Sequence, residues 1–281
     1  MINVLFYGNC QIGAIKSILN LPKNKYNCTH LECYLTNIDK KKFKNIIENS
    51  NIIITQTISD NYKNKDYLGT SFIVKNAKEN CKIFLFTPCY LNFYYPDLTY
   101  KKNKNGEIIH SPSDYHYNFL IQSFKEKLPI EKYIDKYVNN IDLYDKKCLD
   151  KIANESILEL ERRFLESKYY KKKNKNVILI PIYNFIKENY KKKLLFYSMN
   201  HPTKFLLHNI CEKIINYLKI ENNMNYNIDP LNNPRCILYK SIQKCVNFDI
   251  EKHHPKLHAK NTVKEITELY YNAYKKIKIN L

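Results

Sequence analysis

The start of the chain pairs a short apolar run with a helical pattern. Residues 2–7 are almost all apolar, Gly8-Asn9 interrupts them, and apolar side chains then recur at helical spacing over residues 12–19. A short apolar run bounded by turn residues is typical of a buried strand. The pattern predicts a strand, a tight turn and a helix.

Two further apolar runs, residues 51–55 and 82–87, end at Gln56 and Pro88. They are apolar throughout, as are strands buried on both faces of a parallel sheet. Residues 66–79 form the expected crossover helix between them. This alternation indicates an α/β layered fold with right-handed crossovers.

The middle of the chain is mostly helical in pattern. We expect a helical insertion over about 113–170 and a C-terminal helical extension over about 221–281, within a single domain spanning residues 1–281. The individual elements expected after residue 112 are helices at 113–127, 131–139 and 145–170, a loop at 171–176, a short apolar segment at 177–180, a helix at 183–190, a strand at 194–197, a helix at 203–218, a loop at 221–234 and a helix at 262–279.

Composition supports a folded domain. The chain has 281 residues, 44% of them hydrophobic, and only four Gly. A chain of this length buries enough surface to fold without disulfides or metal, which excludes intrinsic disorder and collagen-like repeats.

The net charge is +19, yet only three of the 46 basic residues are Arg. Lys, Asn, Ile and Tyr are all abundant and all have A/T-rich codons, so codon bias is one explanation of the charge. A nucleic-acid partner is the other, although such proteins favour Arg, which grips phosphate bidentately. Either way, the charge attracts phosphorylated ligands such as coenzymes or nucleotide-sugars.

Nine cysteines are spread along the chain with no CxxC pair, so no zinc or thioredoxin spacing occurs. His253, His254 and His258 are read as a surface cluster rather than a metal site. No signal peptide or membrane-spanning run is found, and we expect a reduced, soluble, cytoplasmic protein without a metal. Glycine-rich dinucleotide, P-loop and HExxH motifs are absent.

Cys10 follows the first predicted strand and opens the first helix. Ligands bind at this edge of open α/β sheets, and a helix N-terminus stabilises a thiolate. Cys10 is therefore a candidate nucleophile; the alternative is a small buried thiol in a tight turn.

Polar residues follow the other predicted strands. Gln56 is a candidate oxyanion donor, while Asp60 and Asp97 are candidates to orient a base or bind sugar hydroxyls. Structural roles remain open for each. His201, between a predicted strand and a helix, is the best general-base candidate, with helix capping as its alternative. His110 and His116 are secondary candidates.

Taken in order, five segments resemble the WcbI family of capsular polysaccharide biosynthesis acetyltransferases. The resemblance covers roughly the first 220 residues. The segments are Gly8-Asn9-Cys10-Gln11, Gln56 with Ser59-Asp60-Asn61-Tyr62, Tyr94-Tyr95-Pro96-Asp97, Ser113-Asp114-Tyr115-His116 and Asn200-His201-Pro202-Thr203.

The resemblance implies a helix-rich, three-layer fold with a small central parallel sheet, of SGNH-hydrolase or flavodoxin type. It also implies binding of coenzyme A or acetyl-CoA and acetyl transfer to a sugar or nucleotide-sugar. Cys10 then stands where SGNH hydrolases have their Ser, and His201 matches their base. Their Asp three residues before the His is replaced by Ser198. The residues implied for oxyanion or substrate binding are Gly8, Asn9, Gln11, Gln56, Asp60, Asp97, Tyr115, His116 and Asn200.

Transfer through an acetyl-thioester on Cys10 and direct transfer are both open at this stage. Two other functions compete with the acetyltransferase. One is an SGNH-like carbohydrate esterase or deacetylase that uses Cys10 and His201. The other is a basic nucleic-acid-binding module, which rests on the net charge alone.

Overall fold

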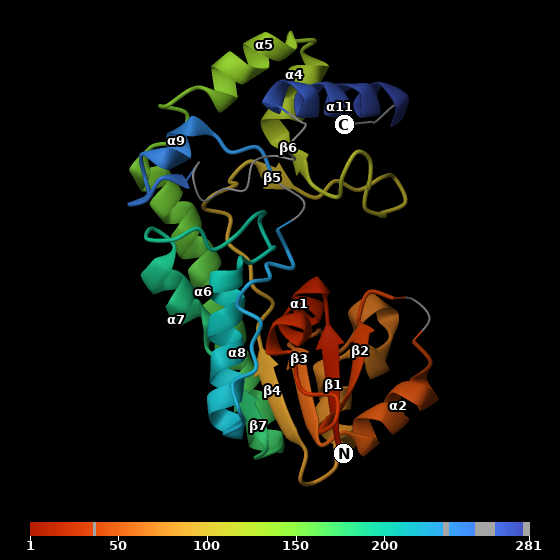
Figure 1. Cartoon of the computed structure of the whole chain (residues 1–281). Helices are drawn as coiled ribbons and strands as arrows, with labels where there is room; N and C mark the ends of the chain where they lie inside the picture. The colour runs from red at the N-terminus through yellow and green to blue at the C-terminus, as the bar shows by residue number, and fades with distance from the viewer. Residues whose placement is uncertain (36–37, 233–235, 251–261, 278–281) are drawn as a thin grey trace. The chain divides into compact units, whose positions relative to one another are not determined.

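Five parallel strands form the central sheet of the protein, in the order β2-β1-β3-β4-β7 (Figure 1). This computed structural model describes residues 1–35, 38–232, 236–250 and 262–277. The strand order, with the chain running outward from β1 in both directions, is that of the flavodoxin-like doubly wound folds. The strands are β1 (Ile2–Gly8), β2 (Tyr26–Glu32), β3 (Ile52–Gln56), β4 (Lys82–Phe86) and β7 (Val177–Leu179).

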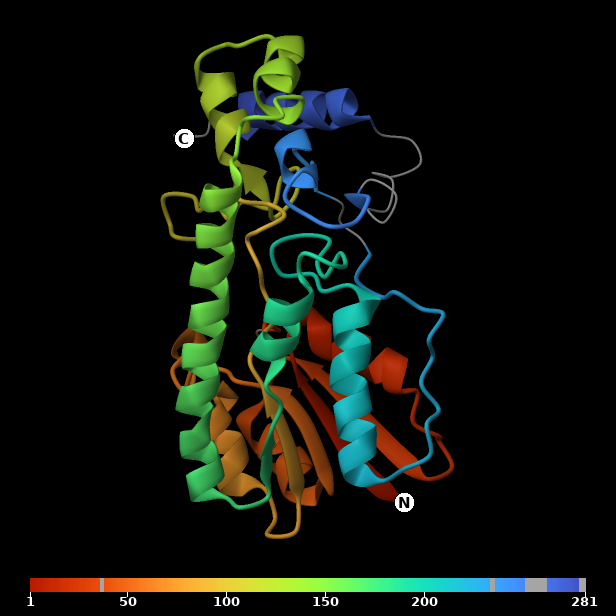
Figure 2. The same cartoon turned by 90° about the vertical axis from the view of Figure 1, so that its left-hand side faces the viewer.

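Helices cover both faces of this sheet, which confirms the three-layer α/β fold. On one face α1 (Cys10–Leu19) packs against α8 (Lys204–Leu218), and α7 (Ile182–Asn189) packs against α8. Figure 2 shows α8 lying across the sheet on this face. On the other face lie α2 (Lys40–Asn49) and α3 (Thr70–Asn76).

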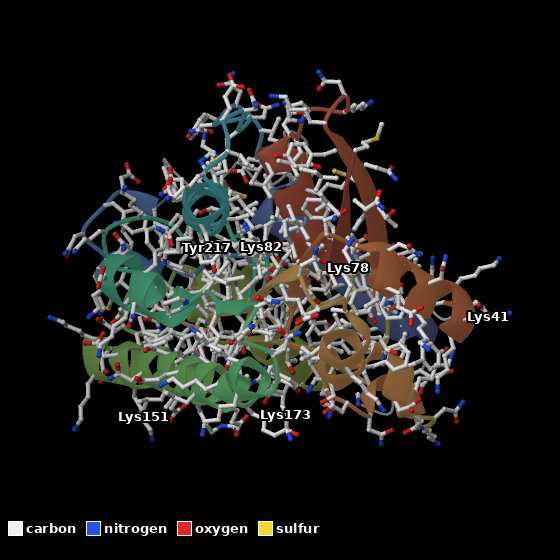
Figure 3. The ribbon with its side chains drawn as sticks, turned by 90° about the horizontal axis from the view of Figure 1, so that it is seen from below. Lys41, Lys78, Lys82, Lys151, Lys173 and Tyr217 are labelled. Atoms are coloured by element: carbon white, nitrogen blue, oxygen red, sulfur yellow. The ribbon has the colours of Figure 1, made fainter. Side chains whose placement is uncertain are left out.

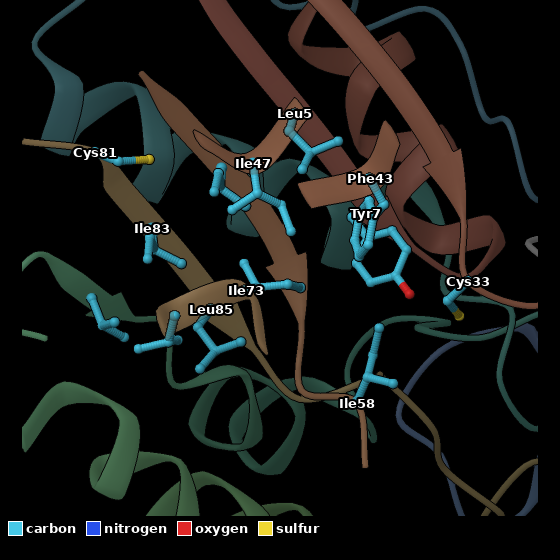
Figure 4. Close-up of a cluster of buried hydrophobic side chains, with 13 residues drawn as sticks. Leu5, Tyr7, Cys33, Phe43, Ile47, Ile58, Ile73, Cys81, Ile83 and Leu85 are labelled. Carbon is cyan, nitrogen blue, oxygen red and sulfur yellow. The ribbon is translucent and has the colours of Figure 1, made fainter. Parts of the chain in front are cut away.

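A hydrophobic cluster fills the space between the sheet and α2 and α3 (Figure 4). Leu5, Ile53 and Ile83 of the strands meet Phe43 of α2 and Ile73 of α3, and all five are at most 1% exposed. Truncating one such isoleucine to alanine costs about 2–5 kcal/mol. The apolar runs that predicted the strands thus supply the core of the sheet.

Residue contacts group the described chain into two units. The first contains the sheet and comprises Met1–Tyr90, Ile157–Asn189 and Asn200–Asn232; the second comprises Leu91–Ser156, Tyr190–Met199 and Asn233–Leu281. The helix α6 (Lys146–Lys173) contributes residues to both.

The second unit is built around tyrosines. Its elements are β5 (Leu98–Thr99), β6 (His116–Tyr117), α4 (Asn118–Lys125), α5 (Ile130–Tyr133), the π-helix η3 (Ile134–Val138), α9 (Lys240–Gln243) and α11 (Val263–Ile277). Strands β5 and β6 pair antiparallel. Tyr133, Tyr239 and Tyr274 are all buried. α11 confirms the helix expected near the C-terminus.

Several sequence-based boundaries are wrong. The helix expected from Ser113 begins at Asn118, because His116 and Tyr117 pair with β5 instead. The helix expected over 66–79 is reduced to α3, preceded by the 3-10 turns η1 (Tyr62–Asn64) and η2 (Asp66–Leu68). α6 continues to Lys173, and lysines at a helix C-terminus complement its dipole.

The strand expected at 194–197 is absent. Its residues are buried, but tyrosine side chains satisfy part of their backbone: Leu195 N–H donates to the Tyr94 hydroxyl (3.3 Å), and Phe196 O accepts from the Tyr95 hydroxyl (3.3 Å). Apolarity there reflects packing rather than sheet pairing.

Candidate active site

Cys10 begins α1 directly after β1, as the sequence predicts. Asn9 caps the helix in an extended conformation, and its side-chain oxygen accepts from Gln11 N–H (3.0 Å). Gly8 precedes it at a crowded point: a Cβ there would lie 2.5 Å from Ile12 Cγ1 and 2.7 Å from Gln56 Oε1. Only glycine fits, so the loop passes close to the end of β3.

Gln56, the last residue of β3, holds this loop. Its Oε1 accepts from Asn9 N–H (2.9 Å), and its Nε2 donates to Gln11 Oε1 (2.8 Å). Both glutamines are at most 1% exposed. A buried amide must be hydrogen-bonded to be tolerated, and these two satisfy each other. Gln56 thereby fixes the start of α1 against the neighbouring strand.

Gln11 extends the connection to two more loops. Its Nε2 donates to the carbonyl oxygens of Cys89 (2.8 Å) and Asn200 (2.9 Å), and its Oε1 accepts from Cys89 N–H (2.9 Å). Cys89 follows β4 and Asn200 precedes α8. One buried amide therefore joins the loop after β1, the loop after β4 and the loop before α8.

The joined loops bring Cys10 and His201 into contact. Cys10 Sγ and His201 Nε2 are 3.7 Å apart, although the residues are separated by 191 positions in sequence. Thr203, two residues after His201, is the N-cap of α8. A thiol and an imidazole at this separation can exchange a proton, which is the arrangement that nucleophilic or general-base chemistry requires.

The pKa of the Cys10 thiol is raised to about 11. Burial is the main cause, and the carboxylate of Glu32 adds to it; the backbone N–H groups of Gln11 and Cys10 act in the opposite direction. The helix N-terminus does favour the thiolate, as the sequence suggested, but burial outweighs it. At neutral pH Cys10 is therefore a neutral thiol.

Glu32 acts electrostatically on Cys10 and is a candidate-site residue that the sequence analysis did not name. It ends β2 opposite Gly8 in the parallel register, and the next residue, Cys33, donates its N–H to Gly8 O (2.8 Å). The phenol of Tyr34 hydrogen-bonds Glu32, and both this bond and burial raise the pKa of Tyr34. Residues 26–32 show no clear apolar run, so the sequence pattern does not predict β2 or the carboxylate at its end.

Asp60 lies at the start of α3 in the same unit. Its carboxylate accepts from Ser71 N–H (2.9 Å) and from the Ser71 hydroxyl (2.6 Å). These bonds satisfy the first turn of the helix. The predicted roles of Asp60, orienting His201 or binding a sugar, stay predictions.

Asp97, Tyr115 and His116 belong to the second unit. Asp97 accepts from the Tyr239 hydroxyl (2.5 Å) and from Phe119 N–H (3.0 Å). His116 is fully buried between the Tyr274 hydroxyl and Ile109 O, each 3.1 Å from a ring nitrogen, and burial lowers its pKa. That these residues contribute to a site with Cys10 stays a prediction.

The described ranges contain neither a metal-binding cluster nor a membrane-spanning helix. There, no group of three His, Cys, Asp or Glu side chains is placed to hold a metal ion. Within the same ranges, no helix combines the length and apolarity needed to cross a membrane. His253, His254 and His258 lie outside the described residues.

The sequence profile of the polysaccharide biosynthesis enzyme WcbI matches residues 3–223. The chain belongs to the WcbI family. The match spans β1 to the end of α8 and so includes Cys10, Gln56 and His201. The resemblance found in the sequence is thereby confirmed, and with it a role as a polysaccharide biosynthesis enzyme.

A solved structure of WcbI has the same fold. It aligns with a TM-score of 0.73 over 98% of this chain and 96% of its own, at 16% identity. That structure is described as a novel polysaccharide biosynthesis enzyme, in its native form without a disulfide bond between coenzyme A and one of its cysteines. No curated protein matches the sequence.

Proposed function

We propose that this WcbI-family protein is an acetyltransferase that moves the acetyl group of acetyl-CoA to a hydroxyl or amino group of a sugar, including nucleotide-activated sugars. The contact of Cys10 Sγ with His201 Nε2 at the carboxyl edge of the sheet carries the proposal. The description of the solved WcbI names coenzyme A and a cysteine together, which supports a coenzyme A thioester as the donor.

His201 acts as the general base. It takes the proton from the acceptor group, whose oxygen or nitrogen attacks the acetyl carbonyl carbon. The carbon–sulfur bond then breaks, and His201 returns the proton to the coenzyme A sulfur. Because the raised pKa makes Cys10 a neutral thiol, an acyl-enzyme route requires that His201 first takes the thiol proton, whereas direct transfer needs no thiolate. Cys10 then helps to hold the thioester in place.

The oxyanion of the tetrahedral intermediate needs donors at the same edge. The backbone N–H of Cys10, in the first turn of α1, suits this role. The N–H of Gln11 is bonded to Asn9, and the Gln56 amide is bonded to Gln11. The oxyanion role predicted for these two donors requires that they leave those bonds when substrate binds.

The test measures acetyl transfer from radiolabelled acetyl-CoA to a panel of sugars and nucleotide-sugars. His201→Ala should lose about 10²–10⁴-fold of the turnover expected from a general base. His110→Ala is the comparison variant: His110 is a secondary candidate for the base, is exposed and is paired with Asp114, and it should keep its turnover if His201 is the base. Near-normal turnover of His201→Ala would remove the base assignment.

Cys10→Ala separates the two routes of transfer. Direct transfer predicts that this variant keeps measurable turnover, whereas an acyl-enzyme predicts that it keeps none. Release of acetate from an acetylated glycan without coenzyme A would instead identify the esterase.

A further inference from the structure

A groove lies between α6 and the loop that follows β3. It has a cavity volume of about 710 Å³, and Thr57 and Ser59 of the loop face Arg162 and Arg163 of α6 across it. A second hollow of about 330 Å³ adjoins it, lies between α6 and α3, and shares Tyr169 and Tyr170 with it. Figure 2 shows α6 running alongside the orange segment that contains α3. We refer to the two hollows together as the α6 groove.

The two arginines distinguish the groove from the lysine-rich surface around it. The chain has three Arg among 46 basic residues; two are Arg162 and Arg163, and the third, Arg235, lies outside the described residues. A codon bias that supplies lysine everywhere does not explain two consecutive arginines in one cavity. Arg differs from Lys in presenting a planar fork of N–H donors, which matches phosphate oxygens bidentately.

The two guanidinium groups are held in position. The carboxylate of Glu159 accepts from Arg162 Nε (2.6 Å) and from Arg163 Nε (2.7 Å), and Arg163 lies over the ring of Tyr90 at 5.5 Å. Arg163 uses one of the five N–H donors of its guanidinium on Glu159, whereas Arg162 uses three, two on Glu159 and one on Glu166. An arginine already fixed in this way loses less side-chain freedom when a ligand binds.

The α6 groove is joined to the candidate active site through the backbone. Thr57 directly follows Gln56, which accepts the N–H of Asn9. Tyr90 directly follows Cys89, whose N–H and carbonyl both bond to Gln11. One lining residue of the groove therefore directly follows Gln56, and the ring that Arg163 covers directly follows Cys89.

The remaining lining suits an anionic ligand that also has a flat or ring-shaped part. Lys75 and Lys173 line the second hollow and add two cationic side chains to the two arginines. The carboxylates of Glu159 and Glu166 pair with the arginines, so the cationic side chains at the groove outnumber the carboxylates by four to two. Tyr169 is 55% exposed, and an aromatic face can stack on a nucleobase or a sugar ring.

We propose that the α6 groove binds the phosphorylated nucleotide part of a substrate. Arg162 and Arg163 contact the phosphate oxygens, and the tyrosines contact the base or sugar. The choice of ligand rests on the proposed function, in which both coenzyme A and a nucleotide-sugar carry a diphosphate attached to a nucleoside. The chemistry is shared, and the experiment decides which of the two occupies the groove.

The experiment is titration calorimetry of the full-length protein with two probes, coenzyme A and uridine 5′-diphosphate. The double variant Arg162→Gln/Arg163→Gln should raise the Kd of the probe that occupies the groove at least tenfold and leave the Kd of the other unchanged. Arg162→Lys/Arg163→Lys should restore only part of the affinity, since it keeps the charge without the fork. Lys168→Gln, an exposed lysine on the same helix, is the control.

The outcomes separate this inference from the proposed function. Unchanged Kd values for both probes in the double variant would overturn the proposal that the α6 groove binds phosphate. They would leave the proposal of acetyl-CoA as the donor standing. If uridine 5′-diphosphate bound in an arginine-dependent way and coenzyme A did not bind at all, acetyl-CoA would be overturned as the donor. The proposed role of the α6 groove would stand. If the wild-type protein bound neither probe, both would be overturned. Circular dichroism melting of each variant confirms that it is folded.

Discussion

The residues around Cys10 hold its side chain as a neutral thiol at the start of α1. Gly8 allows the close passage of the loop, the two glutamines fix it, and Glu32 and burial keep the thiol protonated. Cys10, Gln56 and His201 could be predicted from the sequence because each stands at the end of an apolar run or the start of a helix. Glu32 could not, because the strand that carries it is half-buried and polar.

The raised pKa of Cys10 makes a prediction about its reactivity. Thiolates react with iodoacetamide and thiols do not, so labelling of the Cys10 peptide should keep accelerating with pH up to about 11. Glu32→Gln removes a charge that raises this pKa and should move the profile to lower pH. Glu48→Gln changes an exposed carboxylate of α2 and should leave the pH profile unchanged. Peptide mass spectrometry over a pH series measures both, and a wild-type plateau near pH 8 would contradict the assignment.

The sequence predicts most readily the helices and strands that bury many of their residues. Strands buried on both faces and helices such as α8, which buries six residues, have unbroken apolar patterns. The sequence pattern does not predict β2 or α2. β2 is an edge strand whose residues are mostly half-buried, and α2 buries only Phe43 and Ile47 in a lysine-rich segment. The prediction for residues 194–197 is wrong for the opposite reason: the apolar residues are buried, but they do not form a strand. An apolar run in the sequence therefore predicts that a segment is buried. Whether that segment also pairs with a neighbouring strand depends on the tertiary structure.

Asp97 gives the second unit a pH-dependent stability. Burial raises its pKa from 3.8 to about 6, although bonds from Tyr239 and Phe119 pull it down. Because the folded pKa lies above the unfolded one, folding is favoured below about pH 4, and this contribution is lost as the pH rises through 6. The shift corresponds to about 3 kcal/mol.

Urea unfolding of the wild type and of Asp97→Asn at several pH values tests this. The wild type should lose about 3 kcal/mol relative to the variant between pH 4 and pH 7. A difference in unfolding free energy that stays constant over this range would show that Asp97 does not titrate as assigned.

For the molecule as a whole, the net charge of +19 is carried by lysines on many elements. Figure 3 shows Lys41 on α2 and Lys173 on α6 at separate edges of the ribbon, and both are exposed. Scattered lysines attract polyanions without reading sequence. The net charge therefore fits a general attraction to phosphate groups. The two arginines of the α6 groove supply the specific phosphate contacts that we propose.

We accordingly expect DNA binding to be weak and sensitive to salt. Anisotropy of a labelled duplex should show binding at about 50 mM salt that is largely lost by about 200 mM. At the higher salt, coenzyme A should raise the melting temperature and the duplex should not. Sequence-dependent affinity that survives about 200 mM salt would revive the nucleic-acid alternative.

The strand order has a consequence for the chain while it is being synthesised. The first four strands of the sheet lie within residues 2–86, but β7 is reached only at Val177 and His201 later still. Domains form from the N-terminal end as they leave the ribosome, so a four-stranded sheet can assemble first with the outer edge of β4 uncovered. Until α8 has emerged, the nascent chain carries Cys10 without its imidazole partner. The contact between Cys10 and His201 therefore forms late in synthesis, after the β4 edge has been exposed to other chains.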